Sequence, residues 1–286
     1  MSFKLNALVA AAMMAASAPA LAVMADATSG NGELLVNLRF YAGDNNVGGD
    51  DISAVFDLGV DMNTFIANRT TAGFTMSWNL AAANYGTAWN DVMTFAGANA
   101  GLIEYNVIAL DNTNFDVAGG SRYLTTGPAT FPSLTNANLN GFQDMNGYVL
   151  ANNSRGTHAS EANGASTATS NDAGVVYFGK AFGNADGDNW ASKTTADTTK
   201  TLATAQNFWF LTTSSTTTTA QATRQAFGYD LDGSGSIGAG EFGQWSFNGS
   251  TLTFATPVPE ASTYGMMLAG LGLVGFMARR RMNRAA

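Results

Sequence analysis

Segments in which apolar and polar residues alternate place the strongest constraint on how this chain can fold. In GELLVNLRFY (residues 32–41), every second residue from Leu34 to Phe40 is apolar, and Asn37 and Arg39 lie between them. This alternation is typical of a half-buried β-strand. The sequence predicts further strands at residues 53–59, 102–110, 122–126, 175–181 and 208–212.

A hairpin and two short helices complete the predicted fold. The segments QWSF (244–247) and STLTF (250–254) flank Asn248-Gly249, a pair that favours the tight type I′ turn of a β-hairpin. Apolar residues have helical spacing over residues 89–96 and 139–149. We therefore expect a mainly β domain, an antiparallel β-sandwich of jelly-roll type with one or two short helices.

The N-terminal segment has the pattern of a secretory signal peptide. Lys4 precedes an apolar run at residues 8–16, and Ala20-Leu21-Ala22 has the small residues of a cleavage site. We predict a signal peptide over residues 1–22, with the mature chain starting at Val23. The alternative is a buried N-terminal helix.

The C-terminal segment combines prolines, an apolar run and an arginine cluster. Residues 264–278 contain 15 residues without a charge, and Arg279, Arg280 and Arg281 follow. A helix of this length spans about 22 Å, against about 30 Å for the hydrocarbon core of a bilayer. With local bilayer thinning we expect a short C-terminal transmembrane helix, whose arginines stay in the cytoplasm because burying each would cost about 3 kcal/mol or more. The alternative is a buried element of the domain.

The same segment resembles the PEP-CTERM sorting signal of Gram-negative bacteria. The resemblance covers the last 29 residues: the motif Val258, Pro259, Glu260 and Ala261, then the apolar run and the arginines. It departs from the usual pattern at Ala261, where a second proline is expected. It implies recognition by an exosortase, a membrane-embedded processing enzyme, removal of the tail near Pro-Glu, and a link to exopolysaccharide and biofilm.

Charge and composition exclude several classes of function. Residues 23–259 contain 8 basic and 20 acidic residues, a net charge of −12, which repels nucleic-acid phosphates. The chain has no cysteine and therefore no disulfide and no thiolate ligand or nucleophile. Its single histidine, His158, lies in a polar segment where we expect a solvated loop.

One stretch, DLDGSGSIGAGE (residues 230–241), matches an EF-hand calcium loop. The predicted ligands occupy loop positions 1, 3, 5, 7, 9 and 12: Asp230, Asp232, Ser234, Ser236, Gly238 and Glu241. Gly228 and Gly243 disfavour the helices that flank an EF-hand. We therefore predict an EF-hand-like Ca²⁺ loop in β surroundings, and the alternative is a surface loop without a metal.

No catalytic motif is recognisable in the sequence. The five tryptophans are expected to pack in the core, in preference to forming a platform on which sugars stack.

We expect three parts: the signal peptide (1–22), a β-rich extracytoplasmic domain (23–256) and the sorting signal (257–286). The predicted function is that of a non-enzymatic surface or matrix protein, tethered transiently to the inner membrane and then periplasmic, cell-surface or extracellular. A carbohydrate-binding or adhesive module, or a glycosidase, is the alternative.

Overall fold

The computed structural model describes residues 23–26, 28–41, 51–111, 113, 117–140, 145–181, 198–259 and 261–282. The predicted signal peptide at residues 1–22 lies outside these ranges.

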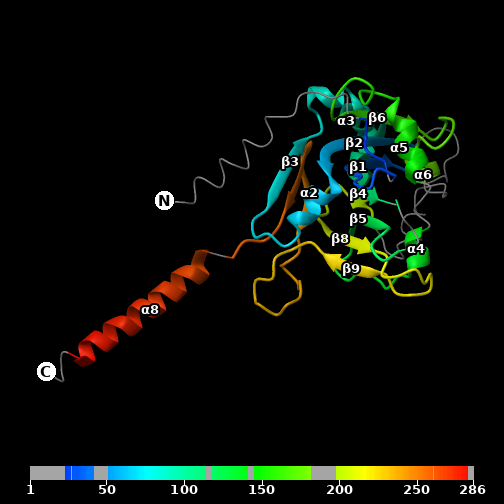
Figure 1. The fold of residues 1–286 in the computed structure, drawn as a ribbon. Helices are drawn as coiled ribbons and strands as arrows, with labels where there is room; N and C mark the ends of the chain where they lie inside the picture. Colours follow the sequence, from blue (N-terminus) through cyan, green and yellow to red (C-terminus); the bar gives the residue numbers. More distant parts are fainter. Residues whose placement is uncertain are drawn as a thin grey trace.

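The body is built on one antiparallel sheet (Figure 1). Nine strands follow the order β3-β11-β10-β8-β5-β4-β1-β2-β6, while β7 pairs with β4 and β9 pairs with β8. The strands are β1 (Glu33–Phe40), β2 (Ile52–Asp61), β3 (Thr75–Asn79), β4 (Glu104–Asp111), β5 (Arg122–Gly127), β6 (Ala165–Thr169), β7 (Lys200–Thr201), β8 (Gln206–Thr212), β9 (Thr223–Ala226), β10 (Gln244–Asn248) and β11 (Thr251–Ala255). The mainly β, antiparallel fold is confirmed. The described strands form a curled single sheet, a half-barrel, and the sandwich prediction is not supported.

Helices are more numerous than the sequence predicts. They are α2 (Met62–Ala67), α3 (Ala88–Ala96), α4 (Asn136–Asn140), α5 (Met145–Asn153), α6 (Phe178–Ala181) and α8 (Ala261–Met282), with 3₁₀ turns η2 (Ala83–Tyr85) and η3 (Gly97–Leu102). The predicted helix at 89–96 is α3. The strand predicted at 175–181 is wrong, because its last residues form α6.

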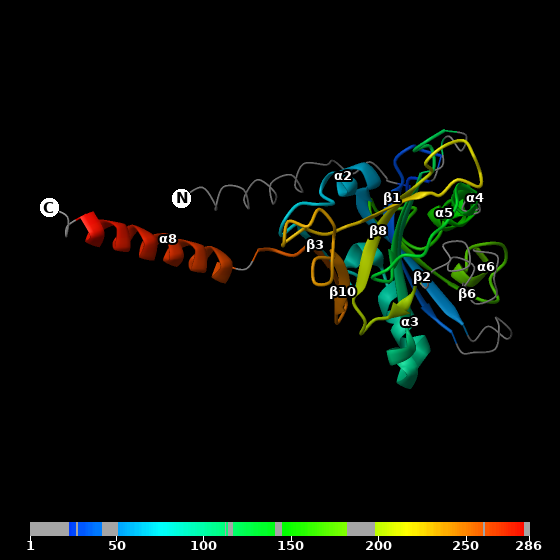
Figure 2. The same cartoon turned by 90° about the horizontal axis from the view of Figure 1, so that it is seen from below.

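Both faces of the central strands are covered. The strand predicted at 32–41 is confirmed as β1, but it is buried on both faces and not half-buried. One face carries the larger core, with Leu34 and Val36 of β1, and α2 and α3 pack on it. The other face carries a second core with Leu35, against which α4, α5 and α6 pack; Figure 2 shows these three helices together on one side of the sheet. Asn37 and Arg39 are therefore buried. The Arg39 guanidinium is neutralised by Glu104 of β4, with an Nη2–Oε2 distance of 2.7 Å.

An aromatic cluster fills the larger core. Phe65 of α2 is fully buried and stacks on Trp245, with ring centroids 5.6 Å apart. The rings of Phe208, Phe227 and Phe254 pack around it at 4.9–5.6 Å. The sheet curls around this cluster, and α2 closes it.

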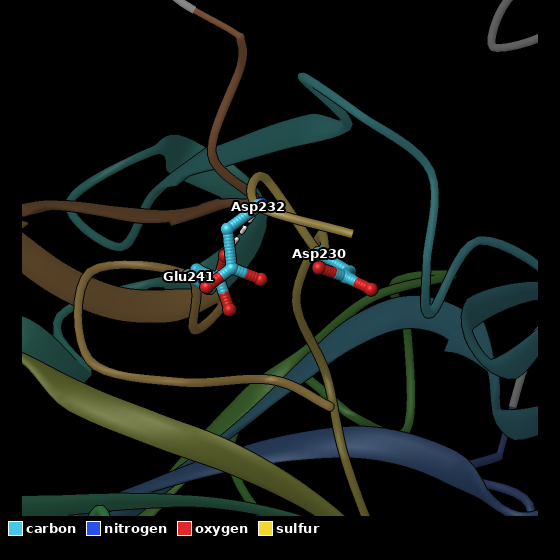
Figure 3. Close-up of side chains that lie close together, drawn as sticks. All are labelled: Asp230, Asp232 and Glu241. Atoms are coloured by element: carbon cyan, nitrogen blue, oxygen red, sulfur yellow. Dashed lines mark hydrogen bonds between the residues drawn. The ribbon is translucent and has the colours of Figure 1, made fainter. Parts of the chain in front are cut away.

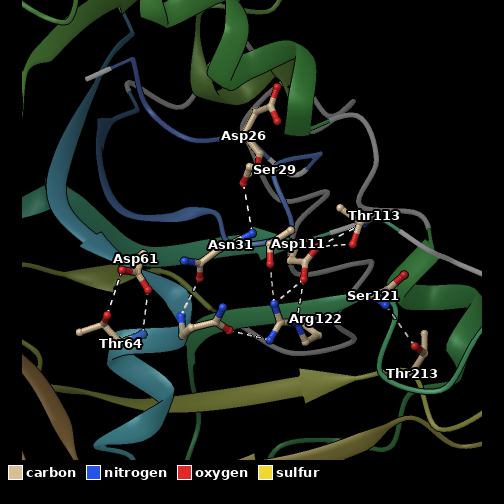
Figure 4. Close-up of polar contacts among 12 residues, drawn as sticks. Asp26, Ser29, Asn31, Asp61, Thr64, Asp111, Thr113, Ser121, Arg122 and Thr213 are labelled. Atoms are coloured by element: carbon tan, nitrogen blue, oxygen red, sulfur yellow. Dashed lines mark hydrogen bonds and ion pairs between the residues drawn. The ribbon is translucent and has the colours of Figure 1, made fainter. Parts of the chain in front are cut away.

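Arg122 of β5 ties several segments together at one end of the sheet (Figure 4). Its Nε donates to Asp111 of β4 at 2.7 Å, Nη1 to the side chain of Asn63 in α2 at 2.8 Å, and Nη2 to the carbonyl of Gly30 at 2.7 Å. Asp61 caps α2 by accepting the backbone N–H of Thr64. A planar guanidinium serves all three acceptors because its donors form a rigid fork.

The predicted C-terminal hairpin is confirmed. β10 and β11 are joined at Asn248-Gly249, and Gly249 has a φ of +57°, a conformation that glycine adopts without strain. β11 also pairs with β3. Beyond it, the Pro257 carbonyl still accepts the backbone N–H of Gly73 at 3.0 Å. The folded domain thus ends immediately before the predicted sorting motif.

Helix α8 extends away from the body in both views (Figures 1 and 2). Its large apolar side chains from Met266 to Val274 are exposed. Within the described residues, no helix combines the length and hydropathy needed to cross a bilayer, so the predicted C-terminal transmembrane helix is not found.

Candidate calcium loop and sorting segment

The segment 229–241 is a loop whose two ends are joined by sheet-like contacts. Tyr229 N–H donates to the Glu241 carbonyl at 2.9 Å, and Gly228 forms an isolated bridge with Phe242. A Cβ atom on residue 228 would lie 2.2 Å from the Glu241 carbonyl oxygen, so only glycine permits this approach. Gly228, which argues against an EF-hand helix, instead closes the loop between strands β9 and β10.

Three predicted ligands lie together in this loop (Figure 3). Oxygen atoms of Asp230, Asp232 and Glu241 all lie within 4.8 Å of one another. Glu241 is buried, at 5% exposure, whereas Asp232 is exposed. Such a spacing of carboxylates suits a hard divalent cation.

Backbone amides occupy most of the carboxylate lone pairs. Glu241 Oε1 accepts from Leu231 N–H at 2.7 Å and Asp232 N–H at 3.2 Å, and Oε2 accepts from Gly238 N–H at 2.7 Å. A carboxylate offers about four lone-pair sites, so about one remains on Glu241. Bidentate coordination of a cation by Glu241 would therefore displace at least one amide.

Asp230 is engaged in the same way. Its Oδ1 accepts from Gly233 and Ser234 N–H, at 2.7 and 3.1 Å, and its Oδ2 accepts from Gly235 N–H at 2.7 Å. Gly235, expected to make the sharp turn, has a φ of +81°. The hydrogen bond from Ser234 N–H is the main cause that lowers the pKa of Asp232, which keeps this carboxylate charged.

The remaining predicted ligands also belong to this network. The Ser234 hydroxyl donates to the Ser236 carbonyl at 3.1 Å, and Gly238 contacts Glu241 as described above. The structure thus gathers all six predicted calcium ligands into one hydrogen-bonded loop. Whether the loop binds calcium stays a prediction.

A groove that sequence reasoning missed lies beside this loop. It has a volume of about 540 Å³ and is lined by Arg69, Trp209, Arg224 and Tyr229, together with Asp230 of the candidate calcium loop. These residues come from separate segments, and no local pattern connects them. The available signal was composition: a domain of net charge −12 has few basic residues, so each arginine is a candidate contact for an anion.

Elsewhere, burial shifts the pKa of His158, Asp57 and Glu33. His158 is buried, at 1% exposure, and this burial lowers its pKa to about 4, so the prediction of a solvated histidine is wrong. Asp57 of β2 is fully buried beside Glu33, where β1 and β2 shift register. Burial, followed by the charge of Glu33, raises the pKa of Asp57 to about 8. The pKa of Glu33 is also raised, mainly because the side chain is buried.

Two predicted tryptophan roles can now be distinguished. Trp89 and Trp245 are buried in the larger core, and Trp78 packs against it. Trp209 is partly exposed, with its indole N–H donating to the Pro128 carbonyl at 2.9 Å. Trp190 lies outside the described residues.

The predicted sorting residues follow directly on the sheet. Val258 is exposed at 59% and Pro259 is partly exposed. Glu260 lies outside the described residues, and Ala261 is the first residue of α8. The predicted cytoplasmic anchor, Arg279, Arg280 and Arg281, lies in the last turns of α8.

Comparison with known proteins supports the interpretation of this segment. Residues 257–281 match the model of the PEP-CTERM protein-sorting motif. Searches of curated proteins and of solved structures found no match to the chain. The C-terminal segment is therefore a PEP-CTERM protein-sorting motif, which marks the chain as an exported substrate of an exosortase.

Proposed function

We propose that this chain is the precursor of a non-enzymatic surface or extracellular-matrix protein, associated with exopolysaccharide and biofilm. The main observation in support is that the sorting motif follows directly on the last contact of the sheet, with no linker between them. The last sheet-like contact is made by Pro257, which is also the first residue of the matched sorting motif (residues 257–281). The domain is complete without the tail, so an exosortase removes α8 without disturbing the fold.

Helix α8 supports the sorting role through its surface. Its large apolar side chains from Met266 to Met277, where described, are 55–76% exposed. Apolar surface of this extent stays in water only at a free-energy cost, so the segment favours the membrane-embedded enzyme and the adjoining lipid. The contact with the inner membrane is transient and ends with processing.

Intact-mass measurement of the secreted protein tests this proposal at both ends. We expect loss of residues 1–22 and loss of the chain beyond the Pro-Glu motif. The variant Glu260→Ala is expected to keep the tail, while Glu161→Ala, an exposed carboxylate in the body, is processed normally. Secreted wild-type protein that retains Ala286, or a chain found in the cytosol with Met1 still attached, would refute it.

We further propose that loop 229–241 binds one Ca²⁺ ion through Asp230, Asp232, Ser234, Ser236, Gly238 and Glu241. The clustering of the carboxylate oxygens of Asp230, Asp232 and Glu241 supports this proposal. Because the ion must displace amides from Glu241, we expect weak binding, with a dissociation constant of about 10⁻⁴–10⁻³ M, a range adequate outside a cell.

Calorimetric titration with calcium tests the loop. Glu241→Gln keeps the size of the side chain and one oxygen acceptor, and it is expected to abolish the heat of binding. Glu161→Gln serves as the matched control. Equal heats for the wild type and Glu241→Gln would exclude this loop as the site.

The absence of a catalytic role can be tested separately. Incubation with exopolysaccharide should release no reducing sugar above the background. Release that a single Asp or Glu substitution abolishes would replace this part of the proposal with a glycosidase.

A further inference from the structure

The groove beside the candidate calcium loop is lined by two arginines, Arg69 and Arg224. Three of the eight basic residues of the body form ion pairs within the described ranges: Arg39 with Glu104, Arg122 with Asp111, and Arg155 with Asp172. Arg69 and Arg224 form no ion pair with any described residue, and both line this groove. In a domain of net charge −12, positive charge collected in one groove favours an anionic ligand.

Both guanidinium groups are held in place by neighbouring residues. Arg69 lies over the ring of Phe210, with its Cζ 5.9 Å from the ring centroid, and its carbonyl accepts from Gly228 N–H at 3.0 Å. Arg224 on β9 donates through Nη1 to the Phe131 carbonyl at 2.6 Å. Each guanidinium has five N–H donors, so most donors of Arg224 remain available. Little side-chain freedom is lost when a carboxylate binds them.

An aromatic surface accompanies the charge. Trp209 on β8 is braced by Phe131 and Phe242, with ring centroids 5.5 and 5.8 Å away. The residue paired with it on β9 is Ala226, whose methyl group leaves part of the indole uncovered. Tyr229 lies at the same groove. A fixed, partly exposed indole offers a flat apolar surface on which the C–H face of a sugar ring can pack.

We propose that this groove binds an acidic polysaccharide, with uronate carboxylates paired to Arg69 and Arg224 and a sugar ring against Trp209. Carboxylates match the forked geometry of arginine, and the pyranose face matches the indole. The open groove lies at the short edge strand β9, where a chain longer than one sugar can pass. The proposal deepens the proposed association with exopolysaccharide, on which it rests, and it does not depend on the sorting or calcium functions.

Two features favour this ligand over other anions and over cleavage of the chain. Single strands and duplexes of nucleic acid carry a phosphate every few ångströms, and two arginines in an acidic body cannot neutralise such a density. Asp230 is the one carboxylate among the lining residues, whereas glycoside hydrolysis uses a pair. The groove is therefore built for binding a sparsely charged polymer.

Titration with partly methyl-esterified oligogalacturonate, which is sparsely charged, tests the proposal, with the fully methyl-esterified oligomer (the ester) as the uncharged match. A chelator is present throughout, so calcium neither gels the oligomer nor fills the loop, and the outcome is independent of the calcium proposal. We expect the ester to bind at least about tenfold more weakly, since one charge-assisted hydrogen bond corresponds to about 10- to 100-fold in affinity.

Variants localise the binding to the groove. Arg69→Gln and Arg224→Gln are each expected to weaken binding about tenfold or more. Arg155→Gln, which removes an arginine paired elsewhere, leaves binding unchanged, and melting curves confirm that all three variants fold. No binding by the wild type, equal binding of the ester, equal binding of single-stranded DNA, or unaltered binding by both groove variants would each overturn the proposal.

Discussion

The buried carboxyl of Asp57 makes a quantitative prediction about stability and pH. In the folded protein its pKa is raised to about 8, against 3.8 for an ordinary aspartate. Between these values the folded state binds one proton more than the unfolded chain. Stability therefore falls as pH rises through this window, by about 1.36 kcal/mol per pH unit.

His158 acts in the opposite direction over part of the window. Its pKa is lowered from 6.5 to about 4, so between these values the unfolded chain binds the additional proton and stability rises with pH. Between pH 4 and 6.5 the contributions of Asp57 and His158 oppose each other, and the raised pKa of Glu33 adds to the fall in stability as pH rises. From pH 6.5 to 8 the Asp57 contribution is no longer offset, and it amounts to a loss of about 1.5 kcal/mol.

The variant Asp57→Asn removes this contribution with little structural change. An asparagine keeps the Oδ1 acceptor that receives Gly59 N–H at 2.8 Å, and it carries no charge to desolvate. Urea denaturation at pH 6.5 and pH 8 is the assay. We expect the wild type to lose about 1.5 kcal/mol more than Asp57→Asn over this interval. The control Asp91→Asn, at an exposed position on α3, should behave like the wild type.

An equal change in unfolding free energy for the wild type and Asp57→Asn would refute the reasoning. It would mean that Asp57 is ionised in the folded protein at pH 6.5, with its charge compensated by solvent or by a shift of β1 against β2.

Three further substitutions test the packing. Phe65→Ala should lower the free energy of unfolding by about 3–5 kcal/mol, because this ring is the centre of the aromatic cluster. The control Phe95→Ala, at 39% exposure, should cost far less in thermal or urea unfolding. Similar losses for the two variants would contradict the assigned core. Gly228→Ala should cost about 1–3 kcal/mol, because its Cβ meets the Glu241 carbonyl. Gly101→Ala, which meets nothing within 4 Å, is its control, and an unchanged midpoint for Gly228→Ala would disprove the close approach. Arg122→Lys should cost about 1–3 kcal/mol, since an ammonium cannot serve Asp111, Asn63 and Gly30 with the same fork; full stability of this variant would show that the clamp is dispensable.

Elements with strong local patterns could be predicted from the sequence. β1 alternates, the β10–β11 hairpin has Asn-Gly at its turn, and α3 has apolar residues at helical spacing. Strand β6 was missed because its sequence, ASTAT, lacks large apolar residues, and pairing with β2 defines it instead. The strand predicted at 175–181 failed because a short apolar run fits a strand and a helix equally well.

The number of layers could not be predicted in this way. Arg39 and Asn37 are compatible with a solvated face by residue type, yet the tertiary structure buries both and pairs Arg39 with Glu104. The candidate calcium loop could be found because its ligands lie within twelve consecutive positions. The groove could not, because Arg69, Trp209 and Arg224 meet only through the fold.

The contact between Pro257 and Gly73 also fixes how a processed molecule would be oriented. A cut near Pro259 leaves a stub of about two residues on the sheet, too short to act as a flexible spacer. A molecule joined to the new C-terminus would therefore be attached to the domain at the edge of the sheet that contains β3 and β11. Copies attached side by side to one support would all direct the opposite end, with β6, away from it.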